Sequence, residues 1–168
     1  MKRLLALTSL SLAAVFMVTS LADGQSAPVQ VPTQDVTSST TPQRDRTRPL
    51  TFTTTGTVVP PPYCAVGASQ KAGDCVPLLC APGVTNTAYC VAPPIVLLCS
   101  GDVTVRFRRG TTTLSTRSVE LQPDCTYRSR VTFRSRTLRQ TTLRVSVRFE
   151  GNAFLFPASA PTHTVRIG

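Results

Sequence analysis

The sequence has no tryptophan, a single histidine and only two lysines, although sixteen of its 168 residues are arginine. Beyond about residue 21 it also has no run of the roughly 20 apolar residues that a membrane-spanning helix needs. The motifs G-x-S-x-G and H-E-x-x-H and a glycine-rich phosphate loop are missing as well. These absences argue against a membrane receptor and the common hydrolase classes. We therefore expect a small protein that is not an enzyme and has no catalytic residues.

The first 22 residues have the three parts of an export signal. Lys2 and Arg3 form a positive start, an apolar stretch begins at Leu4, and the small residues Ser20 and Ala22 fit the signal peptidase. We predict a signal peptide over 1–22 and a protein that is secreted or at the cell surface, with no membrane span after cleavage. The alternative, an uncleaved anchor helix, is disfavoured by the serines and threonines that dilute the stretch.

All six cysteines follow this signal, and an even number of cysteines in an exported protein predicts disulfides. They are Cys64, Cys75, Cys80, Cys90, Cys99 and Cys125. A zinc site is disfavoured, because no C-x2-C pair occurs and His163, the only histidine, is interpreted as a surface residue. We expect no metal and no cofactor.

Two segments between the signal and residue 95 differ in composition. Residues 23–62 are rich in Pro, Thr, Ser and Gln, which predicts a disordered linker or, as an alternative, an O-glycosylated stalk. Residues 63–94 hold four cysteines among Pro, Gly and Ala without a sustained helical or strand period. At about 32 residues this Cys-rich segment is too small for a hydrophobic core, so we expect an irregular unit held by two disulfides.

From residue 95 the pattern changes to alternating apolar and polar residues, which is typical of half-buried antiparallel strands. The alternation is clearest at Val103–Phe107, Tyr127–Phe133 and Leu143–Phe149. Turn signals such as Arg109-Gly110 separate the short strands. The pattern predicts an all-β domain over 95–168, a small antiparallel sandwich. We expect a bulge near residues 116–118, because the apolar positions change there from even to odd numbers.

Parity also predicts one disulfide. Cys99 shares odd numbering with Val103 and Cys125 shares it with Tyr127, so both sulfurs should point into the same core. The other four cysteines pair most simply as Cys64 with Cys75 and Cys80 with Cys90. Other pairings of these four stay open.

The end of the chain resembles bacterial immunoglobulin-like repeats. The residues that carry the resemblance are Leu143–Asn152, with its Phe-Glu-Gly-Asn turn, then Pro157–Ala160 and the closing strand Thr164–Ile167. The resemblance covers residues 98–168 and implies an Ig-like sandwich, a module that usually acts as a spacer, stalk or adhesive unit. The chain departs from the family in having one copy rather than a tandem array, and in lacking the tryptophan of antibody-type domains.

The positive charge is concentrated in the predicted sandwich. Residues 99–168 hold twelve arginines and four carboxylates, 12 − 4 = +8, whereas residues 23–98 hold four basic and four acidic residues. Alternation turns many arginines away from the core. These candidate anion-binding residues are Arg106, Arg108, Arg128, Arg130, Arg134, Arg144 and Arg148. The alternative is a solvated face that blocks aggregation.

The resemblance and the charge pattern together lead to two functional hypotheses. The first is a secreted or surface-associated Ig-like protein with a structural, adhesive or binding role, whose partner is an anionic polysaccharide or cell-envelope polymer held by arginines. The alternative is a small secreted ligand-binding or inhibitory protein that acts on a protein partner through its Cys-rich segment. Specific nucleic-acid binding is disfavoured, since the aromatic residues share the core parity and offer no stacking platform.

Overall fold

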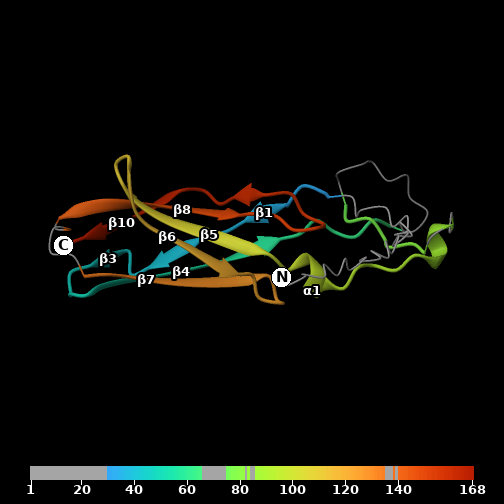
Figure 1. Ribbon diagram of the computed structural model, residues 1–168, viewed down its shortest axis with the longest axis horizontal. Helices are drawn as coiled ribbons and strands as arrows, with labels where there is room; N and C mark the ends of the chain where they lie inside the picture. The colour runs from blue at the N-terminus through green and yellow to red at the C-terminus, as the bar shows by residue number, and fades with distance from the viewer. Residues whose placement is uncertain (1–29, 66–74, 82, 84–85, 135–137, 139) are drawn as a thin grey trace, which may run out of the picture.

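The computed structural model describes residues 30–65, 75–81, 83, 86–134, 138 and 140–168, and the expected signal peptide lies outside them. The described chain is mostly β-structure in two sheets, with one short 3-10 helix and one short α-helix (Figure 1). The strands are β1 (Asp35–Val36), β2 (Ser39–Thr41), β3 (Arg44–Asp45), β4 (Leu50–Val59), β5 (Asp102–Arg109), β6 (Thr112–Glu120), β7 (Thr126–Phe133), β8 (Thr141–Phe149), β9 (Ala158–Ser159) and β10 (His163–Ile167). The helices are η1 (Thr87–Tyr89) and α1 (Ile95–Leu98).

The first sheet is built around β4. It pairs antiparallel with β7 along one edge and with β1 and β2 along the other. Val36 faces Val58 and Ser39 faces Thr55, so β1 and β2 keep one register and are interrupted only at residues 37 and 38.

The second sheet has the order β3-β10-β8-β5-β6, with β9 beside the end of β8. All neighbours are antiparallel except β3, which runs parallel to β10. The chain thus leaves the first sheet after β2 and joins the second at β3. The predicted bulge is present in β6, but it lies at Leu114, between the partners of Phe107 and Arg108, and not at residues 116–118.

The core lies between the two sheets. Phe52 of β4 and Phe133 of β7 come from the first sheet and meet Phe107 of β5 from the second. The ring centroid of Phe107 lies 6.1 Å from that of Phe52 and 5.7 Å from that of Phe133. These rings pack in one buried cluster with alternate residues of β8 and β10, which makes the fold sandwich-like.

The prediction of a disordered linker over 23–62 is wrong for the residues that form β1 to β4. Leu50, Phe52 and Val58 of β4 are buried and alternate with threonines on the outer surface. Threonine is β-branched and favours strands, so a Thr-rich stretch with apolar residues at every second position builds a half-buried strand. Buried Thr54 is satisfied by a hydrogen bond to Thr40, with 2.9 Å between the two hydroxyl oxygens.

The Cys-rich segment over 63–94 is an excursion between β4 and α1. Because strands before and after it share one core, the sandwich does not begin at residue 95 as expected. The segment extends from the end of the sandwich opposite to the C-terminus (Figure 1). It contains the disulfides Cys64–Cys75 and Cys80–Cys90, as the simplest pairing predicted, and single β-bridges join Tyr63 to Val76 and Leu79 to Val91.

The predicted disulfide between Cys99 and Cys125 is present, and both residues are buried. Cys99 precedes β5 of the second sheet and Cys125 precedes β7 of the first, so the bond joins the two sheets at the Cys-rich end. Asn152, after β8, reinforces this end by donating hydrogen bonds to the carbonyls of Leu98 and Ser100 at 2.8 and 3.0 Å.

Candidate anion-binding face

Six arginines lie on or beside the outer surface of the second sheet, where the exposed residues alternate with the buried ones. They are Arg44 on β3, Arg106 and Arg108 on β5, Arg144 and Arg148 on β8, and Arg166 on β10, and together we call them the arginine face. Arg108 lies directly opposite Arg144, and Arg166 directly opposite Arg44. Along β8 the face extends from Arg148 to Thr142, the partner of Arg166. These six steps correspond to about 20 Å at the rise of a strand.

The structure divides the arginines that sequence analysis grouped together. Arg128 and Arg130 of β7 are exposed on the first sheet, next to Thr55 and Thr53 of β4, and therefore face away from β5 and β8. Arg134 is exposed beyond the end of β7. Alternation of apolar and polar residues shows on which side of its strand each residue lies, but it does not show which sheet the strand joins.

Two members of the arginine face were not among the predicted site residues. Arg166 follows the alternation of the last strand and was recognisable from it. Arg44 was not recognisable, because its segment has the composition of a linker, and it reaches the face only through the parallel pairing of β3 with β10.

The positive charge of this face has little compensation. Like charges directly opposite each other on neighbouring strands are destabilising, and the face holds two such pairs. The ion pair from Arg148 Nε to Glu150 Oε2, at 3.2 Å, is exposed and therefore weak. Within the described part of the chain, Arg106, Arg144 and Arg166 have neither an ion pair nor a side-chain hydrogen bond.

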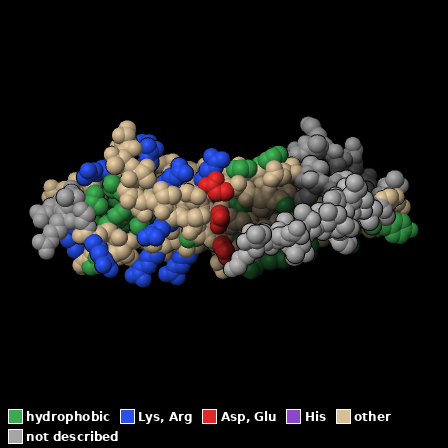
Figure 2. All heavy atoms as spheres, in the orientation of Figure 1, with side chains coloured by type: hydrophobic (Ala, Val, Ile, Leu, Met, Phe, Trp, Pro, Cys, Tyr) green, Lys and Arg blue, Asp and Glu red, His purple; other side chains and the backbone are tan. Residues whose placement is uncertain are grey.

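Carboxylates gather at the other end of the same sheet. Asp102 faces Glu120 across β5 and β6, and Glu150 follows β8 beside them. In Figure 2 red side chains lie near the middle of the molecule, and blue ones are scattered over the half that ends in β10, along both its upper and its lower margin. Asp124 is nearby in sequence, and hydrogen bonds from the Thr126 hydroxyl and N–H lower the pKa of its carboxyl group.

A groove of about 250 Å³ crosses the arginine face between β5, β8 and the chain from β9 to β10. Arg106 and Arg148 flank it on neighbouring strands, offset by two residues because Arg106 faces Ser146. Its polar lining consists of Thr104, Arg106, Ser146, Arg148, Ser159 and Thr162. Among the described residues, the lining of the groove thus combines two cationic side chains with four hydroxyls and contains no carboxylate.

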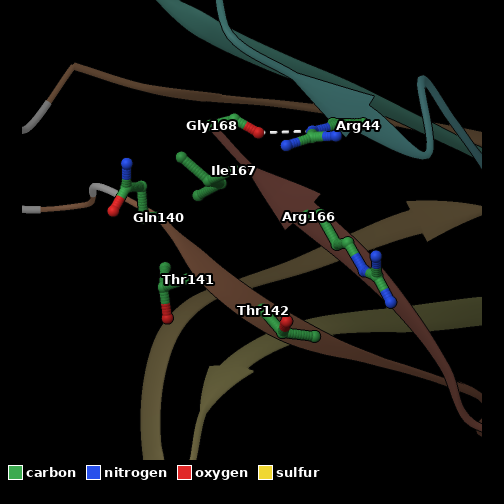
Figure 3. Close-up of a pocket in the computed structure, with 7 residues that line it drawn as sticks. All are labelled: Arg44, Gln140, Thr141, Thr142, Arg166, Ile167 and Gly168. Carbon is green, nitrogen blue, oxygen red and sulfur yellow. Dashed lines mark hydrogen bonds between the residues drawn. The ribbon is translucent and has the colours of Figure 1, made fainter.

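A second hollow of about 250 Å³ lies at the end of the face, between β3, β8 and β10 (Figure 3). Here Arg44 turns toward the end of β10, where its Nε donates to the Gly168 carbonyl. In the close-up, Arg166 extends in another direction, away from the Arg44 side chain. The two guanidinium groups therefore do not converge on one point, and this hollow is a less suitable anion site than the groove.

His163 is half-buried rather than on the surface as expected. Its Nε2 lies 2.8 Å from the Thr40 hydroxyl and its Nδ1 lies 3.2 Å from the Ser38 hydroxyl, and burial lowers the pKa of the imidazole. The ring is thus part of a hydrogen-bond network between the sheets. Among the described residues its side-chain partners are hydroxyl groups and include no carboxylate. No thiol is available either, since the six cysteines are bonded to one another.

No family model, curated protein or solved structure matches the chain. Among the described residues, no helix is long and apolar enough to cross a membrane. The same residues contain no group of three His, Cys, Asp or Glu side chains arranged to hold a metal ion. The functional argument therefore rests on the geometry of this chain.

Proposed function

We propose that the protein is an exported, Ig-like binding protein that attaches to anionic polymers, such as acidic polysaccharides of a cell envelope, through its arginine face. The observation that carries the proposal is the gathering of six arginines on one face of the second sheet, with two pairs directly opposite each other and three side chains without a partner among the described residues. On the outer surface of the first sheet, by contrast, the described residues include two arginines, Arg128 and Arg130, beside the threonines of β4.

The electrostatic cost of the face favours binding over mere solubility. A surface that serves solubility alone is best built from interspersed charges of both signs. On the second sheet the carboxylates Asp102, Glu120 and Glu150 lie at one end, and the arginine face extends along the strands from there. An anionic polymer lying along β8 would relieve the repulsion between Arg108 and Arg144, and arginine is the residue best suited to bind sulfate, phosphate and carboxylate groups with paired donors.

The strand pairing supports an Ig-like architecture. With β1 and β2 taken as strand A, and β4, β5, β6, β7, β8 and β10 as B, C, C′, E, F and G, the sheets are A-B-E and C′-C-F-G, an arrangement used by Ig-like sandwiches. The chain departs from antibody domains in its disulfide, which joins the starts of C and E instead of strands B and F. This architecture suits a module that displays a sheet surface to a ligand.

The disulfides support export. Three disulfides and no free cysteine among the described residues are typical of proteins in an oxidising, extracellular environment. Envelope polysaccharides and other acidic glycans are encountered in that environment. Location and ligand class are therefore consistent with each other.

Binding to immobilised dextran sulfate tests this function. Replacing Arg144 and Arg166 by serine should raise the dissociation constant at least tenfold, whereas replacing Arg128 and Arg130, which removes the same charge from the other sheet, should raise it less than threefold. Both pairs are exposed, so folding should be unaffected. Binding by the native protein should also fall steeply between 0.1 M and 1 M NaCl, as the screening length drops from about 10 Å to about 3 Å. Equal losses for the two variants would mean that net charge, and not this face, holds the polymer.

A second, separate contact surface is favoured by the Cys-rich end. Most of the exposed large apolar side chains of the described chain lie there, among them Tyr89 at 77% exposure and Val91 at 65%. Lys71 and Asp74 are the only charged residues between 63 and 98. An exposed apolar surface of this kind suits a protein partner and is independent of the arginine face.

A further inference from the structure

The groove on the arginine face lies beside an irregularity in the neighbouring strand. Ser159 of β9 faces Arg148 of β8, and His163 of β10 faces Val145 of β8. The segment from β9 to β10 therefore advances four residues where β8 advances three. The chain between Ser159 and His163 thus holds one extra residue relative to β8, a local irregularity of the kind seen in β-bulges. Ser159 and Thr162, on either side of this irregularity, line the groove together with Ser146 of β8 and Thr104 of β5.

The two arginines of the groove are placed to act together. Arg106 and Arg148 occupy diagonal positions on neighbouring strands, about 7 Å apart at their bases, which is within the reach of two long side chains toward one group. Glu150 binds Arg148 through Nε, so its two Nη groups stay available to a ligand. Arg106 has no ion pair or side-chain hydrogen bond within the described part of the chain.

The hydroxyls add donors and acceptors that a bare charged patch lacks. Each can donate to an anionic oxygen and accept from a hydroxyl of the ligand. The volume of about 250 Å³ is below the roughly 300–1,000 Å³ of pockets that enclose a whole small ligand. The groove therefore suits one charged group and the part of its carrier next to it.

We propose that this groove is a specific site for a tetrahedral oxyanion ester, a sulfate or phosphate group borne on a hydroxyl-rich polymer. The inference rests on the proposed function and narrows its ligand class. A carboxylate has two oxygens in one plane and is satisfied by one guanidinium fork. A sulfate or phosphate ester presents three oxygens in different directions, and so can accept from Arg106, Arg148 and a hydroxyl at the same time.

The test compares three polymers with one backbone: dextran sulfate, phosphorylated dextran and carboxymethyl dextran, matched in charge density. The native protein should bind dextran sulfate or phosphorylated dextran at least tenfold more tightly than carboxymethyl dextran, and the better of the two identifies the ester. Replacing Ser146 by Ala together with Thr162 by Val changes no charge. This variant should bind the preferred ester about fivefold more weakly and carboxymethyl dextran unchanged.

The variants also separate the two proposals. Arg106→Ser with Arg148→Ser should abolish the preference for the ester, and Arg128→Ser with Arg130→Ser should leave it intact. Similar affinity for all three polymers, or an unaltered preference in the Ser146 and Thr162 variant, would overturn the groove while leaving the polyanion function in place. Absence of binding to every polymer would overturn the proposed function itself.

Discussion

At the scale of single residues, His163 joins the two sheets. It begins β10 of the second sheet, and its ring nitrogens contact Thr40 of β2 and Ser38 beside it. Thr40 in turn satisfies the buried Thr54 hydroxyl. Nearby Tyr127 donates to the Thr37 carbonyl at 2.7 Å, and burial raises the pKa of its hydroxyl to about 12, so it stays neutral and adds no charge to the network. The neutral imidazole fits this arrangement best.

The stability of the protein should therefore depend on the protonation of His163. Its pKa is lowered in the folded state, so the unfolded chain takes up the proton first as the pH falls below about 6.5. The free energy of unfolding should be constant above that value and decrease below it, with a slope of at most about 1.4 kcal/mol per pH unit, the limit for one proton. Urea denaturation at pH 8, 7, 6 and 5 measures this.

Glutamine at position 163 serves as the matched variant, because it retains a donor and an acceptor but does not titrate. His163→Gln should show the same stability at pH 8 and pH 5.5, where carboxylates are still largely ionised. A slope that persists in this variant would assign the pH dependence to other groups.

At the scale of strands, the sequence allowed prediction of those elements whose inward positions are all apolar. The alternation of β5, β7 and β8 identified their buried faces, and the structure agrees at Val105, Val131 and Val145. In β4 two inward positions are Thr54 and Gly56, and the pattern was hidden. A Cβ at Gly56 would lie 2.4 Å from the Tyr127 hydroxyl oxygen, so the glycine makes room for a ring from β7. That need arises only once the two strands are paired.

The place of β4 in the core can be tested with two neighbouring substitutions. Phe52 is fully buried between Phe107 and Phe133, so Phe52→Ala should lower the free energy of unfolding by about 3–5 kcal/mol. Thr53 points to the outer surface, so Thr53→Ala should change the free energy of unfolding by less than about 0.5 kcal/mol. Chemical denaturation of both variants gives the comparison. Equal, small effects would place this segment outside the core, as a linker would be.

At the scale of the whole molecule, the order of the strands along the chain does not show which strands become neighbours in the sandwich. The sequence showed the excess of arginine and the side of each strand on which it lies, but the arginine face depends on which strands become neighbours. Arg44 and Arg166 are 122 positions apart in the sequence and meet only in the folded sheet. The same long-range assembly leaves the Cys-rich segment as an insertion, closed by its own two disulfides.

The disulfides should therefore differ in what they stabilise. Cys99–Cys125 closes a loop of 26 residues and joins the two sheets, so replacing both cysteines by alanine should cost about 3–4 kcal/mol and lower the melting temperature by about 10–20 °C. Cys80–Cys90 closes a loop of 10 residues outside the core cluster, and its removal should leave the main transition within about 2 °C. Calorimetry of both variants, with non-reducing peptide mapping to verify the remaining bonds, measures the difference. Equal shifts would show that the Cys-rich segment and the sandwich unfold as one unit, because a local crosslink stabilises the core only if the segment that it closes is coupled to that core.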